Sequence, residues 1–140
     1  MASKYFEFKD ALKVKIVSHF NLTEEEFESI FEKASLISMP KGKTLFKEGK
    51  PSSSVYFVAD GKATILKLGE EINHVSVGDV LGEMSLVGGG ASSATVIAET
   101  DMSLFRFSKE TFDVLLNRFP NLNNSIVLEA IGRKLQQNDQ

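Results

Sequence analysis

The chain has 140 residues and a net charge of −3 at pH 7, from 16 basic and 19 acidic side chains. Hydrophobic residues at 42% and charged residues at 25% are typical of one globular domain with its own core. The acidic balance argues against a nucleic-acid surface, and no apolar stretch approaches the roughly 20 residues of a membrane span. The N-terminus lacks a signal-peptide core, and the absence of cysteine excludes disulfides and thiolate metal sites. We therefore expect a cytoplasmic protein.

Two helices are expected at the N-terminal end. In residues 4–20 apolar side chains repeat at helical spacing, although a shorter run also alternates as a strand would. The helical face consists of Phe8, Leu12 and Ile16, and the alternating run of Leu12, Val14 and Ile16. A second helix is predicted after Thr23, because Thr23 and Glu26 have the spacing of a capping box. Leu22 and Phe27 have the spacing of the accompanying hydrophobic staple.

From residue 35 onward the sequence changes to short runs of β-prone residues separated by glycine. The expected strands are Ser35–Met39, Thr44–Phe46, Ser54–Ala59, Lys62–Lys67, Ile72–Val77, Ser93–Ala98 and Ser103–Phe107. Asp60-Gly61, between two of these runs, predicts a β-hairpin with a two-residue turn. Strands this short and this regularly spaced predict a mainly β fold, a sandwich or an antiparallel jelly roll.

Helices are expected again after the last strand. Ser108 is a predicted N-cap, with Phe107 and Phe112 at staple spacing, and Pro120 suits the first turn of a final helix through about Leu135. That helix carries two rows of apolar side chains, Leu122, Ile126 and Ala130 in one and Val127, Ile131 and Leu135 in the next. One row suffices to cover a sandwich, so we expect the other row to pair with its copy in a homodimer. The alternative is that both rows pack on the strands and the preceding helix.

The stretch from residue 78 to residue 96 carries the most informative motif. It contains a Gly78-Asp79 turn, then Leu81-Gly82-Glu83, Met84-Ser85-Leu86, three glycines at 88–90, Ser92-Ser93 and Ala94-Thr95-Val96. Gly82 permits close backbone approach, because it has no Cβ and tolerates positive φ. A helical turn beginning at Glu83 would present N–H groups without intrahelical partners, which is an anion site. One stretch therefore offers a carboxylate, free amides and hydroxyls.

This motif resembles the phosphate-binding cassette of the cyclic nucleotide-binding domain family, and turn glycines extend the resemblance from Leu22 onward. The resemblance implies one domain over residues 1–140, an antiparallel jelly roll (double-stranded β-helix) with flanking helices. Its parts are N-terminal helices in 1–34, a β-roll in 35–107 and C-terminal helices in 108–137. The implied ligand site consists of Gly82, Glu83, Met84, Ser85, Ser92 and Ser93 in the cassette, with Ile65, Ile72 and Val75 on the base side.

Each implied site residue also has a structural interpretation. Glu83 would accept a hydrogen bond from a ribose 2′-hydroxyl, or would be a surface carboxylate in the first turn of a short helix. The three base-side residues are equally suited to a closed core. The glycines at 88–90 would form an adaptable lid or a short mobile loop.

The sequence departs from the family pattern at one position. Where the family places the arginine that pairs with the cyclic phosphate, this chain has Ser92. Two charge-assisted bonds of roughly 1.5–3 kcal/mol each are replaced by one hydroxyl contact of about 1 kcal/mol. A difference of order 2–4 kcal/mol corresponds to a loss of about 30- to 1,000-fold in affinity. Another cation would have to compensate, and by resemblance Lys62, Lys67 and Arg106 are the candidates.

Neither a catalytic nor a metal-binding constellation is predicted. His19 and His74 are the only histidines and are 55 residues apart, whereas a metal site in a jelly roll needs a cluster of imidazoles and carboxylates. The glycines at 88–90 lack the Lys-Ser/Thr sequel of a P-loop. No Ser/His/Asp or Cys/His set stands in a motif context. We therefore expect a protein that is not an enzyme and has no cofactor.

The resemblance implies a regulatory sensor that binds a small nucleotide-like ligand, with cAMP or cGMP bound weakly because of Ser92. Ligand would draw residues 83–93 inward and shift the C-terminal helices, a change of population rather than a reaction. The alternative is a domain that has lost its ligand and serves as a dimeric scaffold or interaction module. Transcription regulators of the family append a basic helix-turn-helix, which this chain lacks before Gln140. We expect neither nucleic acid nor membrane as a partner.

Overall fold

The structure is a computed structural model that describes residues 3–82 and 92–138, with side chains in 4–82 and 92–132. Its elements are α1 (Ser3–Phe20), α2 (Glu24–Phe31), β1 (Ser35–Met39), β2 (Thr44–Phe46), β3 (Ser54–Asp60), β4 (Ala63–Lys67), β5 (Glu70–Val75), β6 (Val80–Leu81), β7 (Thr95–Ala98), β8 (Met102–Ser108), α4 (Lys109–Arg118) and α5 (Pro120–Asn138). The predicted helices at both ends are confirmed.

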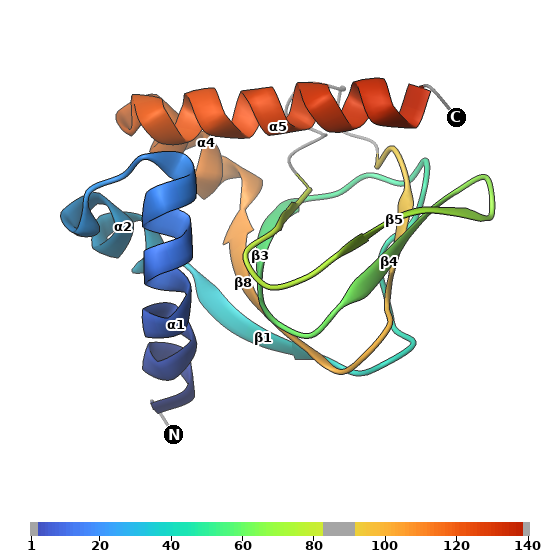
Figure 1. Cartoon of the computed structure of the whole chain (residues 1–140), viewed down its shortest axis with the longest axis horizontal. Coiled ribbons are helices and arrows are strands. Elements are labelled where there is room, and N and C mark those ends of the chain that lie inside the picture. The colour runs from blue at the N-terminus through green and yellow to red at the C-terminus, as the bar shows by residue number, and fades with distance from the viewer. Residues whose placement is uncertain (1–2, 83–91, 139–140) are drawn as a thin grey trace.

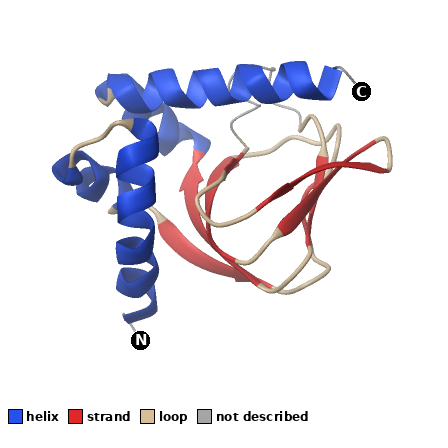
Figure 2. Ribbon diagram, in the orientation of Figure 1, coloured by secondary structure: helices blue, strands red, loops and turns tan. Residues whose placement is uncertain are grey.

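The strands form two four-stranded sheets, with strand orders β1-β8-β3-β6 and β2-β7-β4-β5. We call them the first and the second sheet. Every pairing between neighbouring strands is antiparallel. The two sheets form the roll, and the helices lie to one side of it and across one end (Figure 2). The predicted mainly β, antiparallel roll with flanking helices is therefore confirmed.

The first sheet separates two hydrophobic clusters. Along β3, Val55 and Phe57 pack in the cluster that contains the helices, whereas Tyr56 and Val58 pack in the cluster inside the roll. This alternation follows from the two-residue period of a strand. The same strand therefore contacts the helices with one face and the interior of the roll with the other.

The N-terminal helices form as their sequence predicts. Thr23 Oγ1 accepts from Glu26 N at 3.0 Å, and Glu26 Oε1 accepts from Thr23 N at 2.9 Å, so the capping box is confirmed. The two helices are joined by Glu28, whose carboxylate accepts from Lys9 Nζ and Lys13 Nζ, each at 2.7 Å. Hydrogen bonds from Lys13 and then Lys9 lower the pKa of Glu28 below its ordinary value.

The predicted hairpin at Asp60-Gly61 is wrong. β3 belongs to the first sheet and β4 to the second, so Gly61 (φ +90°) turns the chain from one sheet into the other. The two-residue hairpin turn is instead Leu68-Gly69, between β4 and β5, where both residues have positive φ (53° and 82°). That is the signature of a type I′ turn. The fifth strand consequently runs from Glu70 to Val75, earlier than expected, and the short β6 was not predicted.

Helix α5 runs above α1 and across the end of the roll (Figure 1). Its first apolar row, Leu122, Ile126 and Ala130, is buried. Asn121 Nδ2 donates to Asn21 O at 2.9 Å, and His19 Nε2 lies 2.5 Å from Glu129 Oε1, so polar contacts join this helix to the end of α1. The rest of the domain does not cover the second row completely, because the side chain of Ile131 is 45% exposed. None of the described helices combines the length and apolarity needed to cross a bilayer.

Candidate functional site

Gly82 directly follows β6 and lies against β3. Its φ is +94°, and a Cβ built on it would lie 2.5 Å from Ser54 O and 3.2 Å from the Phe46 ring. The predicted close backbone approach is therefore present, and glycine is required here by both conformation and space. Glu83, Met84, Ser85 and the glycines at 88–90 lie outside the described residues.

Ser92 lies against the connection between β2 and β3. Its backbone N donates to Lys50 O at 2.9 Å, and its O accepts from Gly49 N at 2.8 Å. Close by, Thr95 Oγ1 accepts from Glu48 N at 3.0 Å. Ser92 and Ser93 are both half-buried. The end of the cassette motif is thus fixed to the loop that leads into β3.

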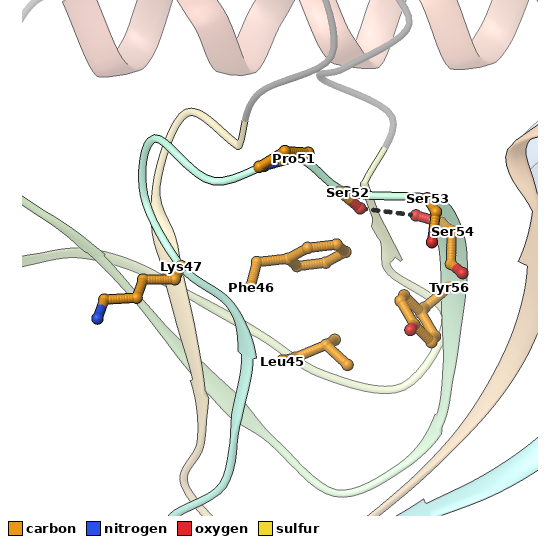
Figure 3. A pocket seen from close by; sticks show the side chains of 8 residues that line it. All are labelled: Leu45, Phe46, Lys47, Pro51, Ser52, Ser53, Ser54 and Tyr56. Atoms are coloured by element: carbon orange, nitrogen blue, oxygen red, sulfur yellow. Dashed lines mark hydrogen bonds between the residues drawn. The ribbon is translucent and has the colours of Figure 1, made fainter.

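A pocket of about 170 Å³ lies beside this loop (Figure 3). It is lined by Leu45, Phe46, Lys47, Pro51, Ser52, Ser53, Ser54 and Tyr56. The rings of Phe46 and Tyr56 meet edge to face with centroids 5.6 Å apart, and Ser52 Oγ donates to Ser54 O at 3.3 Å. Figure 3 shows Lys47 pointing away from the two rings. The pocket is smaller than the roughly 300–1,000 Å³ of ordinary ligand sites.

The sequence analysis does not predict these lining residues. Its predicted ligand site consists of the cassette residues and the three base-side residues. The available signal was the run of serines before β3 followed by Tyr56, which places hydroxyls and a ring at the start of a buried strand. That signal has no specificity without the fold. Gly82 and Ser92 come near this pocket only because β6 pairs with β3 and the β2–β3 loop bonds to Ser92.

Ile65, Ile72 and Val75 gather on the inside of the second sheet. Ile65 is 4% and Val75 3% exposed, and both belong to the cluster inside the roll, with Ile72 half-buried against it. Ile72 lies opposite the register shift between Ile65 and Leu66. The three predicted base-side residues thus share one wall, which at Ile65 and Val75 is closely packed.

The three candidate cations lie in different places. Lys62 is exposed in the turn before β4, where its backbone N donates to Thr100 Oγ1 at 3.0 Å. Lys67 ends β4 at the Leu68-Gly69 turn and pairs in register with Glu70. Arg106 lies in the middle of β8, half-buried and in register with Tyr56. Of the three, Arg106 is the one that lies inside a strand of the roll and away from its ends.

The two histidines lie in separate surroundings. His19 contacts Glu129 of α5, whereas His74 Nδ1 lies 3.5 Å from Glu99 Oε1 and His74 Nε2 lies 3.8 Å from Glu71 Oε1. Glu71, His74 and Glu99 are all exposed, with one ligand-type atom of each within 4.8 Å of the others. Counting histidines alone missed these carboxylates, which only the sheet brings to His74. Exposed groups of this kind are common without a bound metal ion.

The family of the chain follows from comparison with known proteins. The sequence model described as the cyclic nucleotide-binding domain matches residues 36–119. The chain therefore belongs to the cyclic nucleotide-binding domain family, a family of regulatory and sensor domains. The match includes both sheets, the pocket and α4.

Individual relatives agree with this assignment. The cyclic AMP receptor protein of Thermus thermophilus is 30% identical over 105 residues, which are 71% of this chain and 48% of that protein. An NTE family protein of Mycobacterium tuberculosis is 30% identical over 118 residues, 84% of this chain and 20% of that protein. The chain thus spans about a fifth to a half of the length of these relatives.

Solved structures give the same fold. The crystal structure of Thermus thermophilus catabolite activator protein has a TM-score of 0.73 at 28% identity, over 84% of this chain and 57% of that chain. The structure described as Sp-2Cl-cAMPS bound to PKAR CBD2 has a TM-score of 0.83 at 21% identity, over 99% and 92%. At that identity the second likeness concerns the fold alone.

Proposed function

We propose that the chain is a ligand-sensing domain that takes a small, nucleotide-like ligand into the roll and passes the binding signal to its C-terminal helices. Its ligand residues would be Gly82, Glu83, Met84, Ser85, Ser92 and Ser93 with Ile65, Ile72 and Val75. The proposal assigns binding and not catalysis. What carries it is Gly82: its positive φ and its close approach to Ser54 call for glycine at the position where the family's cassette has one.

The helices are suited to the output of such a domain. α5 contacts His19 of α1 through Glu129, and Asn21, directly after α1, through Asn121; a shift of the helix can break and reform these polar contacts. A ligand that binds one position of α5 better than another would change their populations. The second candidate function is a dimeric scaffold without a ligand, which the small pocket and the closely packed Ile65 and Val75 favour.

Replacing Ser92 with Arg is the direct test of the sensor. We expect the wild-type chain to bind cAMP and cGMP more weakly than about 100 μM, because Ser92 supplies no charge for the phosphate. Ser92→Arg is expected to raise affinity at least about tenfold by isothermal titration calorimetry. Lys50→Arg, on the neighbouring exposed loop, is the matched control and should leave affinity unchanged. Low-micromolar binding by the wild-type chain, or no gain in Ser92→Arg, would contradict this account of the pocket.

The second row of α5 is expected to form a homodimer with its copy. Leu128, 70% exposed, adds to the apolar surface around Ile131, and exposed contiguous apolar surface usually marks an interface. Sedimentation at about 50 μM is expected to give twice the mass of one chain, since dimerisation depends on concentration. Ile131→Asp should return the monomer, whereas Val114→Asp, on exposed α4 surface, should not. A wild-type monomer would rule out both the dimer and the scaffold that depends on it.

A further inference from the structure

A row of side chains crosses all four strands of the first sheet. Ser35 of β1 pairs in register with Arg106 of β8, Arg106 pairs with Tyr56 of β3, and Tyr56 pairs with Leu81 of β6. Side chains of directly paired residues in antiparallel strands leave the sheet on the same face. Tyr56 and Leu81 pack in the cluster inside the roll, so the side chain of Arg106 also leaves the sheet on the inside.

Among the residues that the structure describes, the neighbours of Arg106 on that face are uncharged. The next row on one side of it is Ile37, Leu104 and Val58, all part of the interior cluster. The next row toward the loop is Ser54 paired with Ser108. A charged side chain among such neighbours is one that proteins ordinarily pair.

The side chain of Arg106 is half-buried and makes no hydrogen bond or ion pair with another residue of the described part of the chain. Lys9, Lys13 and Lys15, by contrast, all have an oxygen partner within 2.8 Å. A guanidinium carries five N–H donors in a planar fork that fits phosphate and carboxylate oxygens. The side chain that carries those donors leaves the sheet on the inside of the roll.

The pocket beside the β2–β3 loop reaches the same row at Tyr56. Tyr56 lines that pocket and is the direct cross-strand neighbour of Arg106. Opposed side chains in such a pair have Cβ atoms roughly 4.5–5.5 Å apart, and a long side chain reaches its diagonal neighbours as well. A ligand that extends from Ser92 past Phe46 and Tyr56 would therefore bring an anionic group within reach of Arg106.

We propose that Arg106 binds the anionic group of the ligand and so makes up in part for the cation that Ser92 does not supply, which is consistent with the weak binding expected above. The inference rests on the proposed function for the ligand's place in the roll. It names the class of ligand, a small molecule with a phosphate or phosphodiester group, held from the β8 wall rather than from the end of the cassette. A cation on this wall binds the phosphate of a ligand that lies deeper in the roll.

The test uses cAMP and inorganic phosphate as two probes on the intact chain. The chain has three arginines, Arg106, Arg118 and Arg133, so their side-chain Nε–Hε signals can be assigned by substitution in ¹⁵N NMR spectra. Both probes are expected to shift the Arg106 signal and leave Arg118 in place. Arg106→Gln should weaken cAMP binding about tenfold or more, and Arg106→Lys should weaken it less, because charge without the fork is retained. Arg118→Gln, next to the Phe119 ring on α4, is the matched control.

The outcomes separate this inference from the proposed function. If cAMP shifts the Ile65 and Val75 amides but not Arg106, and Arg106→Gln binds equally well, the inference is overturned and the sensor stands. If phosphate shifts Arg106 and cAMP shifts nothing, the anion site is supported and the nucleotide sensor fails. If neither probe moves Arg106, the inference is overturned. Should Arg106→Gln fail to fold, the wild-type signal and Arg106→Lys decide the question.

Discussion

Replacing Phe57 with Ala is expected to lower the free energy of unfolding by about 4 kcal/mol, measured by urea denaturation. Phe57 is 0% exposed, so truncation leaves a cavity that its neighbours cannot close. Its ring centroid lies 5.1 Å from that of Phe31, 5.7 Å from Phe107, 5.9 Å from Phe20 and 6.2 Å from Phe112. Edge contacts of this kind add to the loss of buried area.

Phe6→Ala is the matched control, because the side chain is the same and 54% of it is exposed. Its contacts are the Tyr5 ring and the Lys9 ammonium, so we expect a loss of about 1 kcal/mol or less. If Phe57→Ala cost as little as Phe6→Ala, the aromatic cluster would not hold the helices on the roll. An equal denaturant slope in the two variants would show that both losses concern the same folded state.

The position of Phe57 explains how the two faces of the first sheet are connected. Phe20 belongs to α1, Phe31 to α2 and Phe112 to α4, so one side chain of β3 contacts three helices. The preceding residue of the same strand, Tyr56, points into the roll and lines the pocket. In the proposed sensor, a ligand that moves β3 at Tyr56 would therefore act on the helices across a single peptide unit.

Local chemistry made much of this fold predictable from the sequence. The capping box at Thr23 and the staple of Phe107 on Phe112, with ring centroids 5.4 Å apart, depend on residues close in the chain. The boundaries of β1 and β2 follow from the glycines and prolines around them. The motif likewise singles out Gly82, whose φ is +94°.

What could not be predicted depends on which strands pair. Asp60-Gly61 has the composition of a hairpin turn. However, β3 pairs with β8 and β6 in the first sheet, whereas β4 pairs with β7 and β5 in the second, so the two strands do not form a hairpin. The hairpin turn that does form has Leu68 where a type I′ turn usually has Asn or Asp before glycine, so its sequence signal is weaker. Nor does the sequence place Arg106 beside Tyr56, because that neighbour relation exists only in the register of β8 against β3.

Gly82→Ala is expected to destabilise the chain by about 2–4 kcal/mol, the sum of backbone strain and overpacking. The added Cβ would meet Ser54 O at 2.5 Å, and that oxygen belongs to a backbone held in register with Ser108. Gly42→Ala is the matched control: its φ is +89°, but nothing lies within 4 Å of an added Cβ. Strain alone should therefore cost Gly42→Ala about 1 kcal/mol.

The difference in the free energy of unfolding between these two variants measures the cost of the close approach to Ser54 by itself, because the two glycines have similar φ values. Shifting the chain at residue 82 to relieve the contact would also shift the residues that follow, where the motif places Glu83. We therefore expect Gly82→Ala in the Ser92→Arg background to lose the gain in cAMP affinity, while Gly42→Ala keeps it. Equal costs of unfolding for the two glycines would mean that Ser54 does not fix the start of the cassette. If Gly82→Ala destabilised the chain more than Gly42→Ala but left the cAMP affinity of Ser92→Arg unchanged, the close approach of Gly82 to Ser54 would stabilise the roll without positioning the ligand.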